Sequence, residues 1–441
     1  MKISRNSFVV LALVASGLAV RAEQWPQFRG PGSTGVGEGA NLPETWSTTQ
    51  NVRWKATIPG QGWSSPIAWG DRIFVTSVIP VGEIEAPKRG LYLQGERPAP
   101  TIEHRYMVYA ISFATGKVIW QRQLHRGVPR GARHLKNTFA SETPTTDGTL
   151  VYAAFGNVGI YAMDFDGALV WSKSLDAAAT RYGWGTASSP VLHDGRLYFV
   201  NDNEDASWLM AVDAATGKTI WRVERPKETN WSTPYVWRHA GRTEIVTNGT
   251  SAIRSYGLDG TALWQLGPSS THVIPTPFAA GDLLYVSSGY VGDSKRPVYA
   301  VRPGANGDIS LKPGEASSAS IAWSLPQGGT YIESPIVFGD YFYTLFDRGF
   351  FTCHDAKTGK EIYTKVRLDP TASGFSASPW AYNNKIFAMS EDGTTYVIQA
   401  GPDFKVVGQN VLDEFTMASP AIHRNSLLIR TATSLYKFAN P

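Results

Sequence analysis

Short runs of alternating apolar and polar residues recur along this chain, and one of them shows the repeating unit clearly. In AVDAATGKTIW, residues 211–221, an apolar run ends at Asp213, crosses Thr-Gly-Lys and resumes with a run that ends at Trp221. Asp213 can accept hydrogen bonds from the backbone amides ahead of it, and Gly217 tolerates the positive φ of a tight turn. The pattern therefore predicts a β-hairpin with an aromatic anchor at its end.

Similar segments occur elsewhere, each ending on a large aromatic residue. AISFATGKVIW ends at Trp120, CHDAKTGKEIY at Tyr363, AMDFDGALVW at Trp171 and SYGLDGTALW at Trp264. Self-similarity at a period of about 20 to 50 residues is typical of a repeat architecture. We therefore expect one large repeat unit rather than two or three unrelated domains, with these aromatic rings packed between neighbouring repeats.

A Ser-Pro or Thr-Pro pair introduces a strand in every repeat. The prolines of these pairs are Pro66, Pro144, Pro190, Pro234, Pro277, Pro335, Pro379 and Pro420. Because proline cannot donate to a strand ladder, we expect this strand, A, to be innermost, with its free edge facing a central channel. Strands B, C and D follow it. Four short antiparallel strands in a repeat of about 42 residues indicate a β-propeller blade.

The two ends of the chain carry complementary parts of one blade. Residues 415–438 supply strands A, B and C of a last repeat, whereas residues 51–58 resemble an isolated strand D. Pairing them would close a ring and remove an open sheet edge. We predict an all-β, eight-bladed propeller of four-stranded antiparallel blades over residues 51–438, closed by pairing of the N-terminal strand with the C-terminal blade. A linear β-solenoid gives no reason for complementary half-blades.

Residues 1–22 have the pattern of a secretory signal peptide. Two basic residues lead an apolar run that starts at Phe8, and Val20-Arg21-Ala22 offers a cleavage site. We expect a soluble, monomeric, periplasmic or secreted protein after cleavage near Ala22. No other apolar run is long enough to cross a bilayer, and the cysteine that a lipid anchor needs is missing at the cleavage point. Residues 23–50, rich in glycine, are expected to form an extended arm on the surface.

The charge balance argues against a nucleic-acid partner. Without Lys2, Arg5 and Arg21 the exported chain has 38 basic and 37 acidic residues, so the net charge is +1. Nucleic-acid binding would need a clustered basic face instead. Cys353 is the single cysteine, which excludes an intramolecular disulfide.

The repeats resemble the pyrroloquinoline-quinone-like β-propeller family, also called quinoprotein alcohol dehydrogenase-like. The resemblance lies in the A-x-D-x-x-T-G-x-x-x-W pattern at residues 211–221, with copies at 110–120 and 354–363, and it covers residues 51–438. The family includes quinone-dependent dehydrogenases as well as cofactor-free propellers, among them a lipoprotein scaffold of the bacterial outer-membrane protein assembly machine. The opening WPQFRGP resembles secreted bacterial members without a settled activity.

The resemblance also says what a dehydrogenase of this family would contain. It implies an adjacent Cys-Cys disulfide against the quinone, a tryptophan floor, a calcium ion held by Glu and Asn, and an Asp base. Cys353 stands alone and the chain has no C-x-x-C-H haem motif. We therefore expect no catalysis and no cofactor, and the alternative is a periplasmic oxidoreductase that needs pyrroloquinoline quinone and calcium.

Five residues near the expected channel are candidates for a site. The column two residues before the marker proline has two ionisable members, Glu142 and Glu333, in opposite blades. They could hold calcium, which takes oxygen ligands, or each could be hydrated or bonded to local backbone. Trp63, Trp184 and Trp231 lie upstream of the same strands, as stacking faces for a cofactor or as packing between blades. The histidines show no metal-ligand spacing.

Insertions mark one face of the expected disc. Residues 81–105 and 290–297 lengthen the B–C connections of blades one and five, and residues 125–137 lengthen the connection into blade two. Long loops are more often functional than idle. The last loop is basic through Arg126, Arg130, Arg133, His134 and Lys136, which would suit an acidic ligand or partner. Residues 304–320 are expected to be flexible and to lie on the opposite face.

The sequence thus favours an exported binding or scaffolding module that holds a protein or cell-envelope partner on its loop-bearing face. The quinone-dependent oxidoreductase is the alternative. A third hypothesis, a binder of carbohydrate or cell-surface polymer, depends on exposed loop aromatics such as Tyr92 and Trp208.

Overall fold

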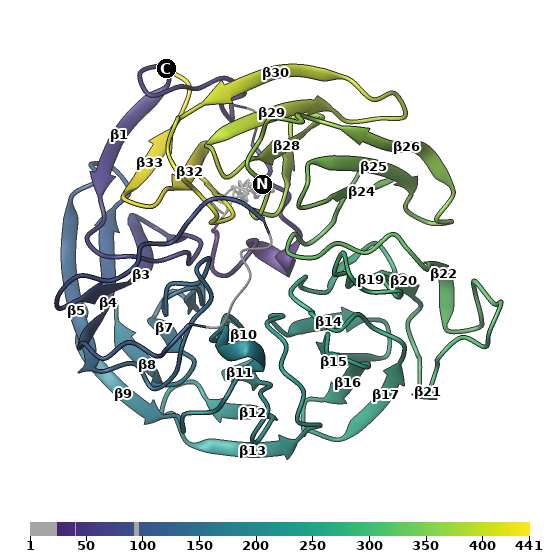
Figure 1. The fold of residues 1–441 in the computed structure, drawn as a ribbon, viewed down its shortest axis with the longest axis horizontal. Helices are drawn as coiled ribbons and strands as arrows, with labels where there is room; N and C mark the ends of the chain where they lie inside the picture. Colours follow the sequence, from purple (N-terminus) through teal and green to yellow (C-terminus); the bar gives the residue numbers. More distant parts are fainter. Residues whose placement is uncertain (1–23, 40, 92–96) are drawn as a thin grey trace, which may run out of the picture.

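The computed structural model describes residues 24–39, 41–91 and 97–441. The expected signal peptide and Tyr92 therefore lie outside the described residues. The described chain forms eight antiparallel sheets arranged around a central axis, as Figure 1 shows. This confirms the predicted all-β, eight-bladed propeller. Within these residues no helix is long and apolar enough to cross a membrane.

Each blade is a meander whose strands follow the chain outward from the axis. Blade one contains β2 (Ile67–Trp69), β3 (Arg72–Pro80), β4 (His104–Ser112) and β5 (Val118–Gly127); blade two β6 (Thr145–Thr146), β7 (Leu150–Phe155), β8 (Gly159–Asp164) and β9 (Leu169–Ser174); blade three β10 (Val191–His193), β11 (Arg196–Asn201), β12 (Trp208–Asp213) and β13 (Thr219–Glu224); blade four β14 (Tyr235–His239), β15 (Arg242–Thr247), β16 (Ile253–Gly257) and β17 (Ala262–Leu266).

The second half of the disc repeats this order. Blade five contains β18 (Phe278–Ala280), β19 (Leu283–Ser287), β20 (Val298–Val301) and β22 (Ile321–Leu325); blade six β23 (Ile336–Phe338), β24 (Tyr341–Leu345), β25 (Phe350–Asp355) and β26 (Glu361–Arg367); blade seven β27 (Trp380–Tyr382), β28 (Lys385–Met389), β29 (Thr394–Gln399) and β30 (Val406–Val411); blade eight β31 (Ala421–His423), β32 (Ser426–Arg430), β33 (Ser434–Phe438) and β1 (Val52–Thr57). Two short 3-10 helices, η1 (Pro31–Ser33) and η2 (Arg181–Gly183), lie outside the blades.

Blade eight is closed by the two ends of the chain. Strand β1 pairs antiparallel with β33, with Trp54 opposite Lys437 and Ala56 opposite Leu435. In Figure 1 the purple β1 lies beside the yellow β33. The predicted closure of the ring is confirmed.

The Ser-Pro and Thr-Pro pairs connect neighbouring blades around the channel. In each bond, the backbone N–H of the residue before one marker proline donates to the hydroxyl of the same residue in the next blade. Bonds of 2.9 to 3.1 Å join Ser65 to Thr143, Thr143 to Ser189, Ser189 to Thr233, Thr276 to Ser334, Ser334 to Ser378, and Ser378 to Ser419. Because this position is buried, the hydroxyl satisfies an amide that has no strand partner there.

The aromatic anchors connect the blades at the outside of the disc. The indole Nε1 of Trp171 donates to the carbonyl of Ala214, at 2.8 Å, and a Cβ built on Gly217 would lie 2.6 Å from the Trp171 ring. The hairpin turn of one blade thus carries a glycine on which the tryptophan of the preceding blade packs. The same pairs are Trp54 with Gly116, Trp120 with Gly167, Trp221 with Gly260, and Trp323 with Gly359. The predicted packing of these rings between blades is confirmed.

Blade five departs from this rule, because an insertion replaces its C–D turn. The indole of Trp264 donates instead to the carboxylate of Glu244 in its own blade, at 2.7 Å. The two-residue strand β21 (Gly307–Asp308) pairs parallel with β17 and adds a fifth strand to blade four. The expectation of a flexible segment over residues 304–320 is therefore wrong for its paired part.

The N-terminal arm crosses the disc and packs into it. Isolated bridges join Trp25 to Ala68 of blade one and Val36 to Ala381 of blade seven. Figure 1 shows the purple coil of the arm near the centre of the ring. Trp25 and Trp46 are 0% and 2% exposed, and Arg29 is buried with its Nη2 donating to the carbonyl of Pro335 at 2.7 Å. The expectation that the arm lies on the surface is wrong, since its large side chains fill space between the blades.

Candidate functional site

A cavity of about 210 Å³ lies at the end of the channel that carries the B–C and D–A connections. It is lined by one equivalent residue from every blade, the residue three positions before the marker proline. These residues are Trp63, Ser141, Ala187, Trp231, Ile274, Ile332, Ser376 and Met417. Because every blade contributes the same position, the cavity surrounds the propeller axis.

Alternation along the extended chain explains why this column faces the cavity. Successive side chains in extended chain point to opposite sides, so the residues three and two before the proline face in opposite directions. Members of the second column point into the blade wall: Ser188 Oγ donates to the carbonyl of Ser232 at 3.0 Å, and Ser232 Oγ donates to that of Pro275 at 2.8 Å. The column chosen from the sequence is thus one residue away from the column that lines the cavity.

A continuous aromatic wall forms one side of the cavity. Ring centroids lie 5.8 Å apart for Trp184 and Trp231, 6.3 Å for Trp231 and His272, 4.5 Å for His272 and Tyr290, and 5.0 Å for Tyr290 and Tyr331. Burial lowers the pKa of His272, so this ring is neutral at pH 7.

Trp63 belongs to another part of the lining. Its ring meets Phe415 edge to face at 5.0 Å. All three tryptophans that the sequence indicated, Trp63, Trp184 and Trp231, line the cavity.

The charged groups beside the cavity neutralise one another. Lys136, whose side chain is 9% exposed, forms an ion pair with the fully buried Glu391. Glu391 also accepts hydrogen bonds from Ser376 Oγ at 2.6 Å and from the backbone amide of Gly90 at 2.8 Å. The carboxylate of Glu391 therefore joins the segments of Lys136, Ser376 and Gly90, and it balances the charge of the Lys136 ammonium.

The structure places Glu142 and Glu333 in different surroundings. One oxygen of Glu142 accepts hydrogen bonds from Thr186 Oγ1 at 2.6 Å and from the amide of Gly156 at 3.1 Å. Neither oxygen of the fully buried Glu333 has a hydrogen-bond partner among the described residues. Burial, and then the charge of Asp347, raise the pKa of Glu333 well above its ordinary value.

Neither glutamate stands in a cluster of three or more acidic, histidine or cysteine side chains among the described residues. No group of three or more His, Cys, Asp or Glu side chains that could hold a metal ion occurs within residues 24–39, 41–91 and 97–441. Glu142 is bonded to local groups of blades two and three, which is the simpler of the two alternatives that the sequence left open.

The arginines of the basic loop, residues 125–137, mostly form hydrogen bonds within the protein. Strand β5 extends to Gly127, so the connection begins three residues later than the sequence suggested. Arg130 donates to the carbonyl of Leu175 at 2.7 Å, and the buried Arg133 donates to that of Glu85 at 2.6 Å. Arg126 pairs with Glu103 at 2.7 Å.

The rest of this loop reaches the cavity. His134 accepts a hydrogen bond from the Lys136 amide at 3.1 Å and packs against Trp184 at 5.0 Å, and both His134 and Lys136 line the cavity. The loop thus builds the wall of the cavity and presents two exposed arginines: Arg126, which pairs with Glu103, and Arg130, which is bonded to the Leu175 carbonyl.

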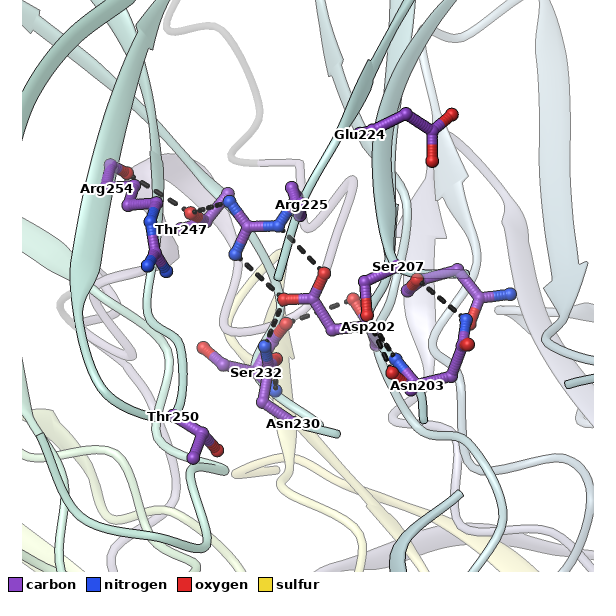
Figure 2. A network of polar contacts seen from close by, with 12 residues as sticks. Asp202, Asn203, Ser207, Glu224, Arg225, Asn230, Ser232, Thr247, Thr250 and Arg254 are labelled. Atoms are coloured by element: carbon purple, nitrogen blue, oxygen red, sulfur yellow. Dashed lines mark hydrogen bonds and ion pairs between the residues drawn. The ribbon is translucent and has the colours of Figure 1, made fainter. Parts of the chain in front are cut away.

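A buried polar network holds the segment that carries Trp231. Figure 2 shows Arg225 pointing at Asp202, and both Arg225 to Asp202 hydrogen bonds are 2.8 Å long. Asp202 also accepts a hydrogen bond from Asn230, and the indole of Trp231 donates to the carbonyl of Gly185 at 2.7 Å. The network clamps blade three to blade four and fixes the ring plane of Trp231. This network could not be predicted from the sequence, because Asp202 comes from a different connection than Arg225 and Asn230.

Comparison with known proteins agrees with this architecture. A family model described as outer membrane protein assembly factor BamB matches residues 104–291. The outer membrane protein assembly factor BamB of Burkholderia pseudomallei (strain K96243) is 22% identical over 304 residues, which are 62% of this chain and 74% of that protein.

Two solved structures share the fold across most of the chain. BamB from Moraxella catarrhalis is 13% identical with a TM-score of 0.53, over 82% of this chain and 98% of that one. A europium-containing methanol dehydrogenase is 12% identical with a TM-score of 0.62, over 95% and 98%. With its repeated hairpin motif and eight closed blades, the chain is similar to the pyrroloquinoline-quinone-like β-propeller family, and the matched family model covers residues 104–291 of it.

Proposed function

We propose that this protein is an exported binding or scaffolding module without catalysis of its own, which holds an envelope partner on the face that carries the long B–C and D–A connections. The observation that carries the proposal is the cavity on that face. It is concave, mostly aromatic and aliphatic, and built by all eight blades. Such pockets are the usual place of ligand binding in proteins.

The named relatives support an envelope partner. The matched family model and the relative from Burkholderia pseudomallei are both described as outer membrane protein assembly factor BamB. A role in the periplasm would require the export that residues 1–22 suggest. The internal bracing of Arg130 and Arg133 favours recognition by shape over recognition by a basic patch.

The alternative function, a quinone-dependent oxidoreductase, fits the residues present less well. Pyrroloquinoline quinone carries three carboxyl groups, which need cations or a metal to balance them. Lys136 is already paired with Glu391, and the described residues offer no cluster for a calcium ion. Cys353 is buried in β25 and is not part of the cavity lining. The cavity can accept a flat ring, but it lacks partners for the charges of this quinone.

The carbohydrate hypothesis also loses its support. Trp208 is 6% exposed and packs on Phe199 at 5.8 Å, so the expectation of an exposed ring there is wrong. Tyr92 lies outside the described residues.

Site-specific photo-crosslinking in the producing cell would test the binding face. A benzoylphenylalanine at Val128, which is 46% exposed in the connection from blade one to blade two, should give one saturable crosslink to an envelope protein. The matched control is the same residue at Lys218, an exposed turn position at the opposite end of a blade. Equal products from both positions, or a product from Lys218 alone, would refute the proposed face.

A further inference from the structure

We propose that the cavity binds a small neutral molecule with one or two fused aromatic rings and a hydrogen-bond acceptor at its edge, and that it rejects the charged quinone of the dehydrogenases. The inference deepens the proposed function by naming the ligand class of the same face. It depends on the size, the rings, the polar atoms and the charges of the lining, taken in turn below.

The size of the cavity suits such a ligand. A cavity of roughly 150 Å³ lined by apolar side chains is large enough to hold benzene. This cavity, at about 210 Å³, leaves room for a second fused ring.

The walls offer ring faces on more than one side. Trp184, Trp231, Tyr290 and Tyr331 come from blades three to six, whereas Trp63 and Met417 come from blades one and eight. Aromatic rings stack well on one another with centroids about 4.5 to 7 Å apart, and methionine sulfur also contacts ring edges favourably. A flat ligand can therefore contact rings from separate blades at once.

The polar groups of the lining are already bonded within the protein. The Asn137 side-chain amide donates to the carbonyls of Trp184 and Thr186 at 3.0 and 2.9 Å. Ser141 Oγ donates to the side-chain oxygen Oδ1 of Asn137 at 2.9 Å, and Ser376 Oγ donates to Glu391. A sugar would bury many hydroxyl groups here without partners, which disfavours carbohydrate.

One tryptophan of the lining has a buried indole nitrogen without a hydrogen-bond partner among the described residues. Trp63 Nε1 is buried and makes no hydrogen bond with any described residue, unlike the indole of Trp231. A buried unsatisfied donor costs about 1 to 3 kcal/mol, so an acceptor on a ligand that reaches it is favoured. This is the reason for the acceptor at the edge of the proposed ligand.

The charges favour a neutral ligand. The Lys136 ammonium is matched by Glu391, and no arginine belongs to the described lining. An anionic ligand would therefore lose its hydration without gaining a cation, and a cationic ligand would meet no unpaired carboxylate at the cavity surface.

Titration of the purified exported chain with a matched probe series tests the inference. The probes are 2-naphthamide, 2-naphthoate, 2-naphthylmethylammonium, methyl glucoside, and pyrroloquinoline quinone with Ca²⁺, followed by calorimetry and tryptophan fluorescence. We expect 2-naphthamide to bind at least tenfold more tightly than either charged naphthalene, and methyl glucoside and the quinone not to saturate. Equal or tighter binding of 2-naphthoate or of the quinone would overturn the inference.

Three variants tie the binding to the cavity. Ala187 is the cavity-lining residue of blade three, so Ala187→Phe should fill the cavity and abolish binding of 2-naphthamide. Ala215→Phe, at an exposed turn, should leave this binding unchanged. Trp63→Phe keeps a ring but removes the unpaired donor, and should weaken 2-naphthamide about tenfold while leaving naphthalene binding unchanged. Circular dichroism melts verify that each variant is folded. Unchanged binding in Ala187→Phe would also overturn the inference.

The two proposals can fail separately. Binding of 2-naphthamide without any crosslink from Val128 would support the ligand site and refute the partner face. A specific Val128 crosslink together with no binding of 2-naphthamide would support the partner face and refute the ligand site.

Discussion

For Glu333, the direction in which the side chain points determines the surroundings of its carboxyl group. It lies two residues before a marker proline, so it faces away from the cavity into the blade, where its carboxyl has no hydrogen-bond partner among the described residues. A charged carboxylate without partners is strongly disfavoured in such a place. Burial therefore raises the pKa of Glu333 and favours its protonated, neutral form in the folded protein.

Replacing this carboxyl should change how stability depends on pH. Burial raises the pKa of Glu333 above that of the unfolded chain, so folding takes up a proton between these two values, and the folded state loses stability as pH rises through this window. Glu333→Gln should remove this loss and be more stable than the parent at pH 8. Urea unfolding at pH 5 and pH 8 measures the difference. Glu315→Gln, at an exposed position, serves as control, and a Glu333→Gln profile parallel to the parent's would contradict the assignment.

At the residue scale, the three tryptophans of the cavity could be predicted from the sequence, but the column of residues three positions before the marker prolines could not. Trp63, Trp184 and Trp231 could be chosen because bulky rings beside the marker strands are rare and specific. The column of eight lining positions as a whole could not be recognised, because its Trp, Ser, Ala, Ile and Met residues share no chemistry, and charge drew attention to Glu142 and Glu333 instead. The marker proline fixed the position along the strand, but not which alternate side chain faces the axis.

The hairpin and its anchor form the element that repeats. Asp213 accepts hydrogen bonds from the amide and the hydroxyl of Thr216, at 2.8 and 2.7 Å, and Gly217 has a φ of 70°. The turn is therefore rigid, and Trp171 of the preceding blade packs against its glycine. One motif shapes the turn and also joins two blades.

Two glycine substitutions separate these roles. Gly195, with a φ of 67°, sits in the A–B turn of the same blade, and a Cβ there would meet nothing within 4 Å. Both Gly217→Ala and Gly195→Ala place alanine at positive φ, which costs about 1 to 2 kcal/mol. Gly217→Ala should cost a further 1 to 3 kcal/mol or so, because it pushes on the Trp171 ring. Equal losses of unfolding free energy in the two variants would argue against the docking of the ring.

Element by element, the sequence predicted what is local. Strand order, turns and anchors follow from residues close together in the chain, whereas β21 pairs with a different blade and has only two residues, Gly307 and Asp308. The packing of the N-terminal arm could not be predicted for a similar reason. Its glycine content hides two tryptophans that pack against blades far along the chain.

For the whole molecule, closure depends on the ends of the chain. Strand β1 completes blade eight, and the arm before it crosses to blade seven. Trp46 packs against Trp380, Phe387 and Phe438, with centroids 5.8 to 6.5 Å apart. This contact joins blade seven to β33 of blade eight, the strand with which β1 pairs, so it should stabilise the closed ring. The half-blades at the two ends made the closure itself predictable from sequence.

Removing the indole ring of Trp46 should lower the stability of the whole propeller. Trp46→Ala removes a fully buried ring and should cost about 3 to 5 kcal/mol in unfolding free energy, with earlier proteolysis of the arm. Trp46→Phe should cost clearly less, because Nε1 of Trp46 has no hydrogen-bond partner to lose among the described residues. Guanidinium unfolding of both variants provides the measurement. A loss below about 1 kcal/mol in Trp46→Ala would mean that the arm does not support the ring.

The central claim is that this propeller binds its ligand on the axis, inside the ring of eight residues that precede the marker prolines by three. A crystal structure of the exported chain soaked with 2-naphthamide tests this most directly. The probe should appear between Trp63 and the aromatic wall around Trp231, with its carbonyl oxygen within hydrogen-bond distance of Trp63 Nε1. Density for the probe elsewhere on the protein, with this cavity empty, would contradict the claim.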